Sequence, residues 1–217
     1  MTKRRTTRVK ANKGQLFIIC GPSGCGKGTV IKELLTREPD IFLSVSATTR
    51  QPREGEVDGV HYHFLKTEQF ESLIGEEGFL EHACFCGNYY GTPRKPVDDH
   101  MENGHPVVLE IEVDGAEQVR KLRPDAVTIY ILPPSLSELR ARLVGRGTEA
   151  PEVVEKRLAR AVEEIPFAYT CDYVVTNHVV EETADALRSI IRSQSFLNKH
   201  MTATVDALLS EKQAVCE

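Results

Sequence analysis

The sequence contains no apolar run that approaches the roughly 20 residues needed by a membrane-spanning helix, so no part of it predicts a membrane protein. No apolar core of a secretory signal follows the N-terminus, and no internal repeat or low-complexity tract is found. The composition, 41% hydrophobic and 27% charged over 217 residues, is typical of a globular chain forming one sizeable domain with insertions. We therefore expect a cytoplasmic protein without a membrane partner.

Disulfide bonds are not expected either, although the chain has six cysteines. They are scattered through apolar segments and one loop, unlike the framework of a small secreted domain, which favours reduced thiols. Cys84 and Cys86 would lie on one strand face with His82, which leaves a metal site open. No second ligand pair at zinc spacing follows, so such a site is the less favoured alternative. The six positions are Cys20, Cys25, Cys84, Cys86, Cys171 and Cys216.

Acidic residues are missing from positions 1–13, which carry six basic side chains. Such a segment could bind nucleic acid or act as a transit sequence, but it has no apolar face and no aromatic residue for base stacking. We expect residues 1–13 to form a basic disordered tail, with nucleic-acid binding the less favoured role.

Apolar runs rich in Ile, Val and Leu predict strands at 15–20, 107–113, 126–132 and 173–177, with a fifth strand at 42–46. Helical periodicity lies between the later runs. Strands that alternate with helices are typical of an α/β fold with a parallel core sheet covered by helices on both faces.

Two regions depart from this alternation. Residues 47–94 combine turns with short aromatic strands, which predicts an inserted, partly antiparallel lobe. From Pro133 onward, Ser135 is placed to cap a helix, and a turn at 145–149 leads into another helix from about Pro151. The chain from Val179 to its end has helical periodicity and is expected to pack on the core and then to fray.

The most informative motif is the glycine-rich segment 21–29, called the phosphate loop below, between the first predicted strand and a helix. It fits the pattern G-x-x-x-x-G-K-[ST], whose backbone N–H groups and helix N-terminus bind phosphate, with one departure. Gly28 replaces the hydroxyl residue that ordinarily contacts Mg²⁺. A lowered pKa is expected for the Cys25 thiol, beside Lys27 at a helix N-terminus, which would make it reactive unless a bound nucleotide covers it. The loop consists of Gly21, Pro22, Ser23, Gly24, Cys25, Gly26, Lys27, Gly28 and Thr29.

Charged residues after the loop indicate a second ligand. Arg50 and Arg53 flank a Pro and Gly turn and could hold a phosphate. Glu81 is an acid in an otherwise apolar strand. In the predicted strand 107–113, alternation places Glu110 and Glu112 on one face near the C-terminal end, where ligands bind in open parallel sheets.

Three further arginines, Arg142, Arg146 and Arg157, lie within the predicted helical hairpin. They could tip toward a nucleotide or belong to solvated helix faces. Charge alone leaves both readings open.

The ordered motifs from about Gly14 to Ile191 closely resemble the guanylate kinase family in its small bacterial form. They include Ser-x-x-Thr-Arg-x-Pro-Arg-x-Gly-Glu from Ser46, Gly-Asn-Tyr-Tyr-Gly from Gly87, and Pro-Pro-Ser. Gly-Arg-Gly-Thr from Gly145, followed by Lys-Arg-Leu, completes the set. The resemblance implies a P-loop kinase fold that transfers the γ-phosphoryl group of ATP to GMP in purine metabolism.

The resemblance also implies a division of the chain. The guanylate-kinase-like domain would span 14–194, with a core at 14–45, 95–137 and 158–194. A GMP-binding lobe at about 46–94 and a lid at about 138–157 would be inserted into it. Residues 195–217 would form a C-terminal helical extension.

Site roles follow from the resemblance in the same way. The phosphate loop would hold ATP together with Arg142 and Arg146, and Arg157 is the preferred transition-state arginine. Mg²⁺ would be bound mainly by ATP and water, and Glu110 and Glu112 would contact the waters bound to the ion and not the ion itself. The residues expected to be catalytic are Lys27, Arg50, Arg146 and Arg157. The residues expected to bind GMP are Ser46, Arg50, Arg53, Tyr62, Glu81, Tyr90, Gly91, Thr92 and Glu112.

The sequence departs from a common family form, Asp-x-Asp followed two residues on by Gln, because it has Glu110, Glu112 and Asp114. The two glutamates keep the charge but shift the carboxylates by about a methylene. Two alternatives stay open: a non-catalytic binding module on the same fold, and a kinase for another nucleoside monophosphate. The intact Lys27 argues against the first.

Overall fold

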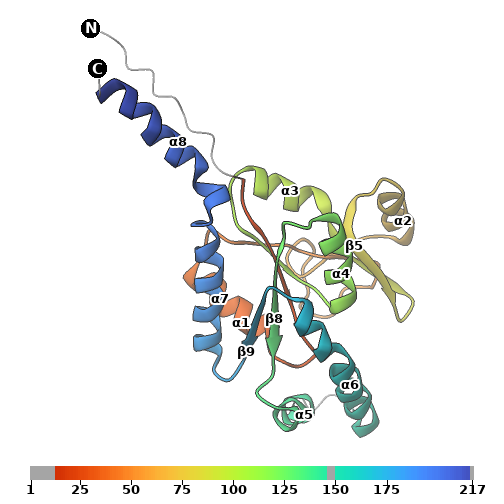
Figure 1. Cartoon of the computed structure of the whole chain (residues 1–217). Coiled ribbons are helices and arrows are strands. Elements are labelled where there is room, and N and C mark those ends of the chain that lie inside the picture. Colours follow the sequence, from red (N-terminus) through yellow and green to blue (C-terminus); the bar gives the residue numbers. More distant parts are fainter. Residues whose placement is uncertain (1–12, 146–149, 216–217) are drawn as a thin grey trace.

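A computed structural model describes residues 13–145 and 150–215 (Figure 1). It confirms the expected α/β class. Five parallel strands form the core sheet in the order β2-β7-β1-β8-β9. These strands are β1 (Leu16–Cys20), β2 (Phe42–Leu43), β7 (Val107–Glu110), β8 (Val127–Leu132) and β9 (Tyr173–Thr176).

Helices cover both faces of this sheet because alternate residues of each buried strand point to opposite sides. On one face, β1 packs through Phe17 and Ile19 against α1 (Lys27–Arg37) and α7 (Val180–Gln194). On the other, Leu16 and Ile18 pack against α3 (Arg94–Glu102), α4 (Val113–Leu122) and the 3₁₀ segment η1 (Ile165–Thr170). The two apolar layers fix the positions of the strand ends, where the candidate site lies.

The five strands lie where the sequence predicts them, but two are clearly shorter than expected. The strand predicted at 42–46 ends at Leu43, and the strand predicted at 107–113 ends at Glu110. Glu112 has extended backbone angles and is the N-cap of α4, so the chain turns into a helix at Val113. Glu112 is therefore outside the strand, although both glutamates line the same cavity.

The inserted lobe is a second, four-stranded sheet in the order β4-β3-β6-β5, as expected partly antiparallel. Phe70 and Phe79 stack with ring centroids 4.2 Å apart and form its small core with Ala47. The elements of the lobe are β3 (Ala47–Thr48), β4 (His63–Phe64), α2 (Thr67–Gly75), β5 (Phe79–Phe85) and β6 (Asn88–Pro93).

The helical pair α5 (Leu136–Gly145) and α6 (Pro151–Glu164) forms as the sequence predicts. Ser135 Oγ accepts a hydrogen bond from the Glu138 N–H at 3.1 Å and so caps α5. Leu139 and Leu143 pack against Val154 and Ala161, which gives the pair a core of its own. Arg146, in the turn between the helices, lies outside the described residues.

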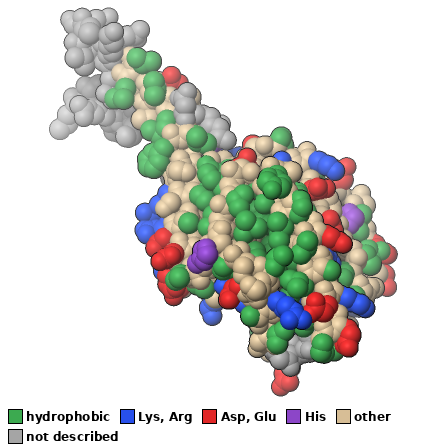
Figure 2. Space-filling model, turned by 60° about the horizontal axis from the view of Figure 1, so that its bottom comes forward, with side chains coloured by type: hydrophobic (Ala, Val, Ile, Leu, Met, Phe, Trp, Pro, Cys, Tyr) green, Lys and Arg blue, Asp and Glu red, His purple; other side chains and the backbone are tan. Residues whose placement is uncertain are grey.

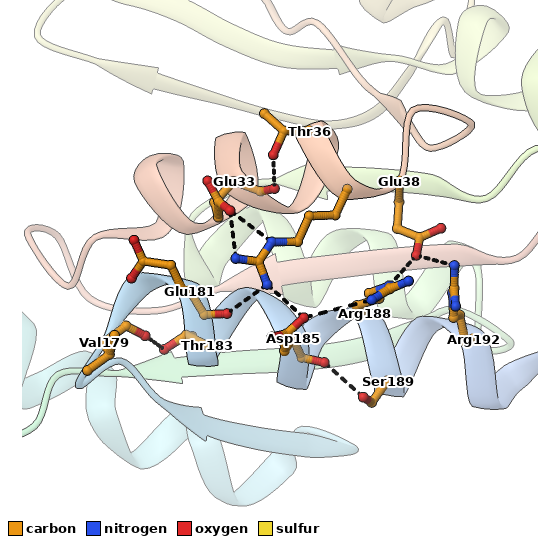
Figure 3. A network of polar contacts seen from close by, with 11 residues as sticks. Glu33, Thr36, Glu38, Val179, Glu181, Thr183, Asp185, Arg188, Ser189 and Arg192 are labelled. Atoms are coloured by element: carbon orange, nitrogen blue, oxygen red, sulfur yellow. Dashed lines mark hydrogen bonds and ion pairs between the residues drawn. The ribbon is translucent and has the colours of Figure 1, made fainter.

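Helices α1 and α7 are also joined by ion pairs (Figure 3). Arg37 bonds to Glu33 on its own helix and to Asp185 on α7, both at 2.7 Å. Glu38 accepts from Arg188 at 2.5 Å and from Arg192 at 2.7 Å. The contacts tie the helix that follows the phosphate loop to the helix that follows β9.

The C-terminal segment packs on the core only in part. Helix α7 does, but α8 (Asn198–Val215) projects from the body (Figure 1), and side chains from 202 to 210 are exposed. Figure 2 shows hydrophobic side chains along this projecting helix. No helix in the described part of the chain combines the length and apolarity that crossing a membrane requires.

Candidate active site

A cavity of about 610 Å³ opens where the parallel strands of the core sheet end. Its walls come from the phosphate loop and the start of α1, from segment 43–46, from residues 60–62 and from residues 110–112. This is the carboxyl edge of an open α/β sheet, the usual place for a ligand. Ser46, Tyr62, Glu110 and Glu112, all singled out from the sequence, line the same cavity as the loop.

Two side chains from distant segments, Asn177 and Arg142, donate hydrogen bonds to the backbone of the phosphate loop. Asn177, only 2% exposed, donates Nδ2 to the Cys25 carbonyl at 2.8 Å, and Arg142 donates Nη1 to the same carbonyl at 3.1 Å. Gly26 has φ 96°, and a Cβ there would lie 2.6 Å from Asn177 Nδ2. Only glycine meets both conditions, so this close approach fixes the shape of the loop.

Basic groups surround the loop. Lys27 Nζ donates to the carbonyls of Gly21 at 2.7 Å and Pro22 at 3.3 Å. Arg157 Nη2 donates to Ser23 Oγ at 2.7 Å. The structure thus brings Arg142 and Arg157, from α5 and α6, to the loop, which favours the nucleotide reading over solvated helix faces. Thr29 lies in the first turn of α1 and lines the cavity.

The prediction of a reactive Cys25 is wrong. The side chain is 0% exposed and packs in the core beneath the loop. Burial raises the pKa of the Cys25 thiol, and the charge of Lys27 offsets this only in part. A buried, protonated thiol is unreactive, so Cys25 has a packing role.

Arg50 lies in the inserted lobe and contacts Glu56 and Tyr62. Arg50 donates Nη1 and Nη2 to the two carboxylate oxygens of Glu56, both at 2.9 Å, and lies 5.3 Å from the centroid of the Tyr62 ring. This pair lowers the pKa of Glu56 to about 2. Tyr90 lies edge-on to Tyr62, with ring centroids 6.2 Å apart. Arg53 donates its backbone N–H to Glu56, and its side chain is exposed.

Glu81 is a buried carboxylate between the lobe and the core, 8% exposed. Thr92 Oγ1 donates to Glu81 Oε1 at 2.6 Å. Burial raises the pKa of the Glu81 carboxyl; its hydrogen bonds with Thr92 oppose the rise, and the charge of Glu112 adds to it. Gly91 lies against the same strand, where a Cβ would come within 2.8 Å of the Glu81 carbonyl oxygen.

Glu110 and Gly28 face each other across the cavity floor. A Cβ on Gly28 would lie 3.5 Å from Glu110 Oε1, an ordinary contact, so space alone does not require glycine there. Solvent reaches Glu110 through the cavity. The surrounding protein nevertheless displaces enough water to raise the pKa of the Glu110 carboxyl, and the charge of Lys27 opposes this rise. Among residues 13–145 and 150–215, no three or more His, Cys, Asp or Glu side chains form a group that could hold a metal ion. His82 and Cys84 therefore do not belong to such a group.

Sequence reasoning missed three supporting residues. Gln118 bonds both backbone groups of His82, accepting from its N–H at 3.2 Å and donating to its carbonyl at 3.1 Å. A Cβ on Gly115 would come within 2.8 Å of Glu81 Oε2, so Gly115 makes room for that carboxylate. Asn177 holds the phosphate loop. Each acts between segments distant in sequence, which local patterns do not reveal.

A glycine-rich phosphate loop at the carboxyl edge of a parallel sheet, with Lys27 and Arg157 bonded to it, is typical of nucleotide-binding proteins of the P-loop class. Comparison with known proteins identifies the member. The family model described as guanylate kinase matches residues 13–194. The chain belongs to the guanylate kinase family.

Individual relatives agree. The chain is 51% identical over 182 residues to a guanylate kinase of Prochlorococcus marinus subsp. pastoris, covering 84% of this chain and 99% of the relative. It is 46% identical over 207 residues to the Thermus thermophilus enzyme, covering 95% and 92%. The crystal structure of guanylate kinase from Anaplasma phagocytophilum superposes with a TM-score of 0.70 at 36% identity, covering 86% and 89%. The protein is thus an enzyme that phosphorylates GMP to GDP with ATP.

Proposed function

We propose that the cavity holds the two substrates on opposite walls, ATP on the phosphate loop and GMP against the inserted lobe. In this division residues 14–45, 95–137 and 158–194 form the core, 46–94 the GMP lobe and 138–157 the lid. Residues 195–217 are an extension, and 1–13 a tail. The observation that carries the proposal is the buried, hydrogen-bonded carboxylate of Glu81, which lies where the inserted lobe meets helix α4.

Guanine recognition by Glu81 follows from its hydrogen-bonding chemistry. An ionised carboxylate accepts from guanine N1–H and the exocyclic amine, whereas adenine offers no N1–H and no amine at that edge. Thr92 orients the carboxylate through its 2.6 Å bond. Ser46, which lines the cavity, is proposed to contact the base as well. An unmatched buried carboxylate is costly, so the wrong base is rejected.

Arg50, Arg53, Tyr62 and Tyr90 clamp the GMP phosphate in this proposal. The bidentate pair with Glu56 holds the Arg50 guanidinium as a planar fork, and the Tyr62 ring supports it. Because the pKa of Glu56 is about 2, the pair stays ionised throughout the neutral range.

Phosphoryl transfer requires alignment and charge neutralisation more than covalent chemistry. We propose that Lys27 and Arg157 neutralise the transferring group from the donor side and Arg50 from the acceptor side. Arg142 fixes the loop through the Cys25 carbonyl. Arg146 is proposed to close over the adenine with the lid, which excludes water during transfer.

Magnesium fits the donor set of the cavity. Glu110 and Glu112 supply two carboxylates beside the loop, and Gly28 leaves space next to Glu110. Mg²⁺ usually keeps several waters and binds nucleotide phosphates with one or two carboxylates. We propose that ATP and water hold the ion, with Glu110 and Glu112 accepting from its waters. Its chemistry there is neutralisation of phosphate charge.

Substrate specificity can be tested directly by supplying GMP, AMP, CMP and UMP to the purified protein with Mg-ATP. Turnover of GMP is expected to exceed that of every other monophosphate, because the other bases lack the pair of N–H donors from which Glu81 accepts hydrogen bonds. The steady-state kcat/KM of each substrate is the measurement. Preference for AMP or a pyrimidine nucleotide would reject the role of Glu81, and no turnover of any would leave only a binding module.

Gly115→Ala is expected to weaken GMP binding without weakening the fold. The new methyl would meet Glu81 Oε2 at 2.8 Å and displace the carboxylate. The displaced carboxylate no longer meets both guanine donors, and a loss of about 1–3 kcal/mol in binding corresponds to a KM for GMP raised roughly tenfold to a hundredfold. The KM for ATP and the melting temperature are expected to stay near the wild-type values, since alanine favours helix α4.

Gly75→Ala is the matched control for this variant, because a Cβ there meets nothing within 4 Å. The two variants are compared by steady-state kinetics and thermal unfolding. An unchanged KM for GMP in Gly115→Ala would show that Glu81 does not need its present position.

We further propose that the enzyme works in the cytoplasm, in purine nucleotide metabolism and the recycling of GMP. The cysteines described in the structure are free, which fits a reducing compartment. Small nucleotides are its proposed partners, and neither a membrane nor a nucleic acid is required for this role.

A further inference from the structure

Helix α6 carries a second arginine that reaches the cavity wall. Arg160 follows Arg157 by three residues, so the two side chains leave the helix as neighbours on one face. Arg157 donates to Ser23 in the phosphate loop, whereas Arg160 Nη2 donates to Glu112 Oε2 at 2.8 Å. One helix therefore contacts both the ATP wall and an acid on the GMP side.

The orientation of Arg160 is fixed from the core sheet. Its Nε donates to Glu164 Oε1 at 2.7 Å, one turn further along α6. The Glu164 carbonyl in turn accepts from the hydroxyl of Tyr130 at 2.9 Å, and Tyr130 is buried in the centre of β8. The Glu164 carboxylate thus holds the guanidinium through Nε, and Nη2 is directed at Glu112.

Glu112 needs such support because of its position. It begins α4 without a side-chain capping bond, and its side chain is 67% exposed. A glutamate side chain with three rotatable bonds loses conformational freedom when a ligand orders it. Arg160 orders it beforehand through Oε2 and leaves Oε1 able to accept from a nucleotide, since a carboxylate has about four acceptor positions.

We propose that Arg160 is a positioning residue for GMP, which holds the Glu112 carboxylate at the cavity wall. The inference deepens the proposed function and rests on the contact of Glu112 with GMP. Glu112 touches the nucleotide, and Arg160 acts through Glu112. Arg160 thereby links the helix that carries Arg157 to the GMP side.

Arg160→Gln tests the proposal. The KM for GMP is expected to rise about threefold to fivefold, the effect of losing one exposed ion pair. The KM for ATP and the melting temperature are expected to stay at the wild-type values, and Arg160→Lys to recover part of the loss. The matched control is Arg140→Gln, which removes an exposed ion pair between Arg140 of α5 and Glu155 of α6, away from GMP.

A double-mutant cycle with Glu112→Gln separates positioning from general structural support. Once Glu112 is changed, Arg160→Gln is expected to have no further effect on the KM for GMP. An unchanged or lowered KM for GMP in Arg160→Gln, equal shifts for GMP and ATP, or additive effects would each overturn the proposal. So would an unchanged KM for GMP in Glu112→Gln. If the proposed function itself is wrong, the wild-type protein will show no preference for GMP in the substrate comparison, before any variant is made.

Discussion

Arg157→Ala is expected to lower kcat by about 10³-fold, because arginines that neutralise a transferring phosphoryl group contribute at least that much. Its guanidinium already lies at the loop, 2.7 Å from Ser23 Oγ. The loss is expected mainly in kcat, since the charge it stabilises develops during transfer and not on binding. Steady-state kinetics with Mg-ATP and GMP measure both parameters.

Arg140→Ala is the matched control for Arg157→Ala. Arg140 lies on α5 and pairs with Glu155 on α6, so its loss perturbs the same helical pair without removing a charge from the loop. Its turnover is expected to stay within about twofold of the wild type, because exposed ion pairs contribute little. Turnover of Arg157→Ala within the same twofold range would show that Arg157 is not the transition-state arginine.

Glu81→Gln is expected to remove most of the preference for GMP over AMP. A site built to pair with a substrate N–H discriminates by about 10⁴-fold against an analogue that lacks it. The amide keeps the shape of the carboxylate but places an NH₂ group where an acceptor is needed. The measurement is the ratio of kcat/KM for GMP and AMP, and an unchanged ratio would assign guanine recognition to other residues.

The pH dependence offers an independent check on Glu81. Burial raises the pKa of this carboxyl above its ordinary value of 4.5. As pH falls through the raised pKa, the carboxyl gains a proton and can no longer accept from both guanine donors. The kcat/KM for GMP is therefore expected to decline at a higher pH than an exposed glutamate would cause, and this limb is expected to disappear in Glu81→Gln.

The fold could be predicted well from the sequence because its signals are local. Apolar runs located the five strands of the core sheet, and Ser135 and Pro151 marked helix starts. The same local reasoning failed at Glu112, where an apparently continuous alternation conceals the change from strand to helix. It failed again for Cys25, since a motif shows the neighbours along the chain but not the core that closes over the thiol.

The supporting residues of the site could not be predicted for a related reason. Asn177 lies 152 positions from Cys25, and Arg160 lies 48 from Glu112. Gly115 matters only through a side chain on another strand. Packing of distant segments creates these contacts, so motifs point to the residues proposed to touch the nucleotide but not to the residues that hold them in place.

The two bonds of Lys27 to the loop carbonyls have a consequence for how ATP is bound. They hold the ammonium over the loop, so the fold itself already restricts the rotamers of Lys27. An ammonium has three donor hydrogens, which leaves one for a phosphate oxygen even while both carbonyls are bonded. Binding then requires little ordering of the protein, and such preorganisation raises affinity without adding a single contact.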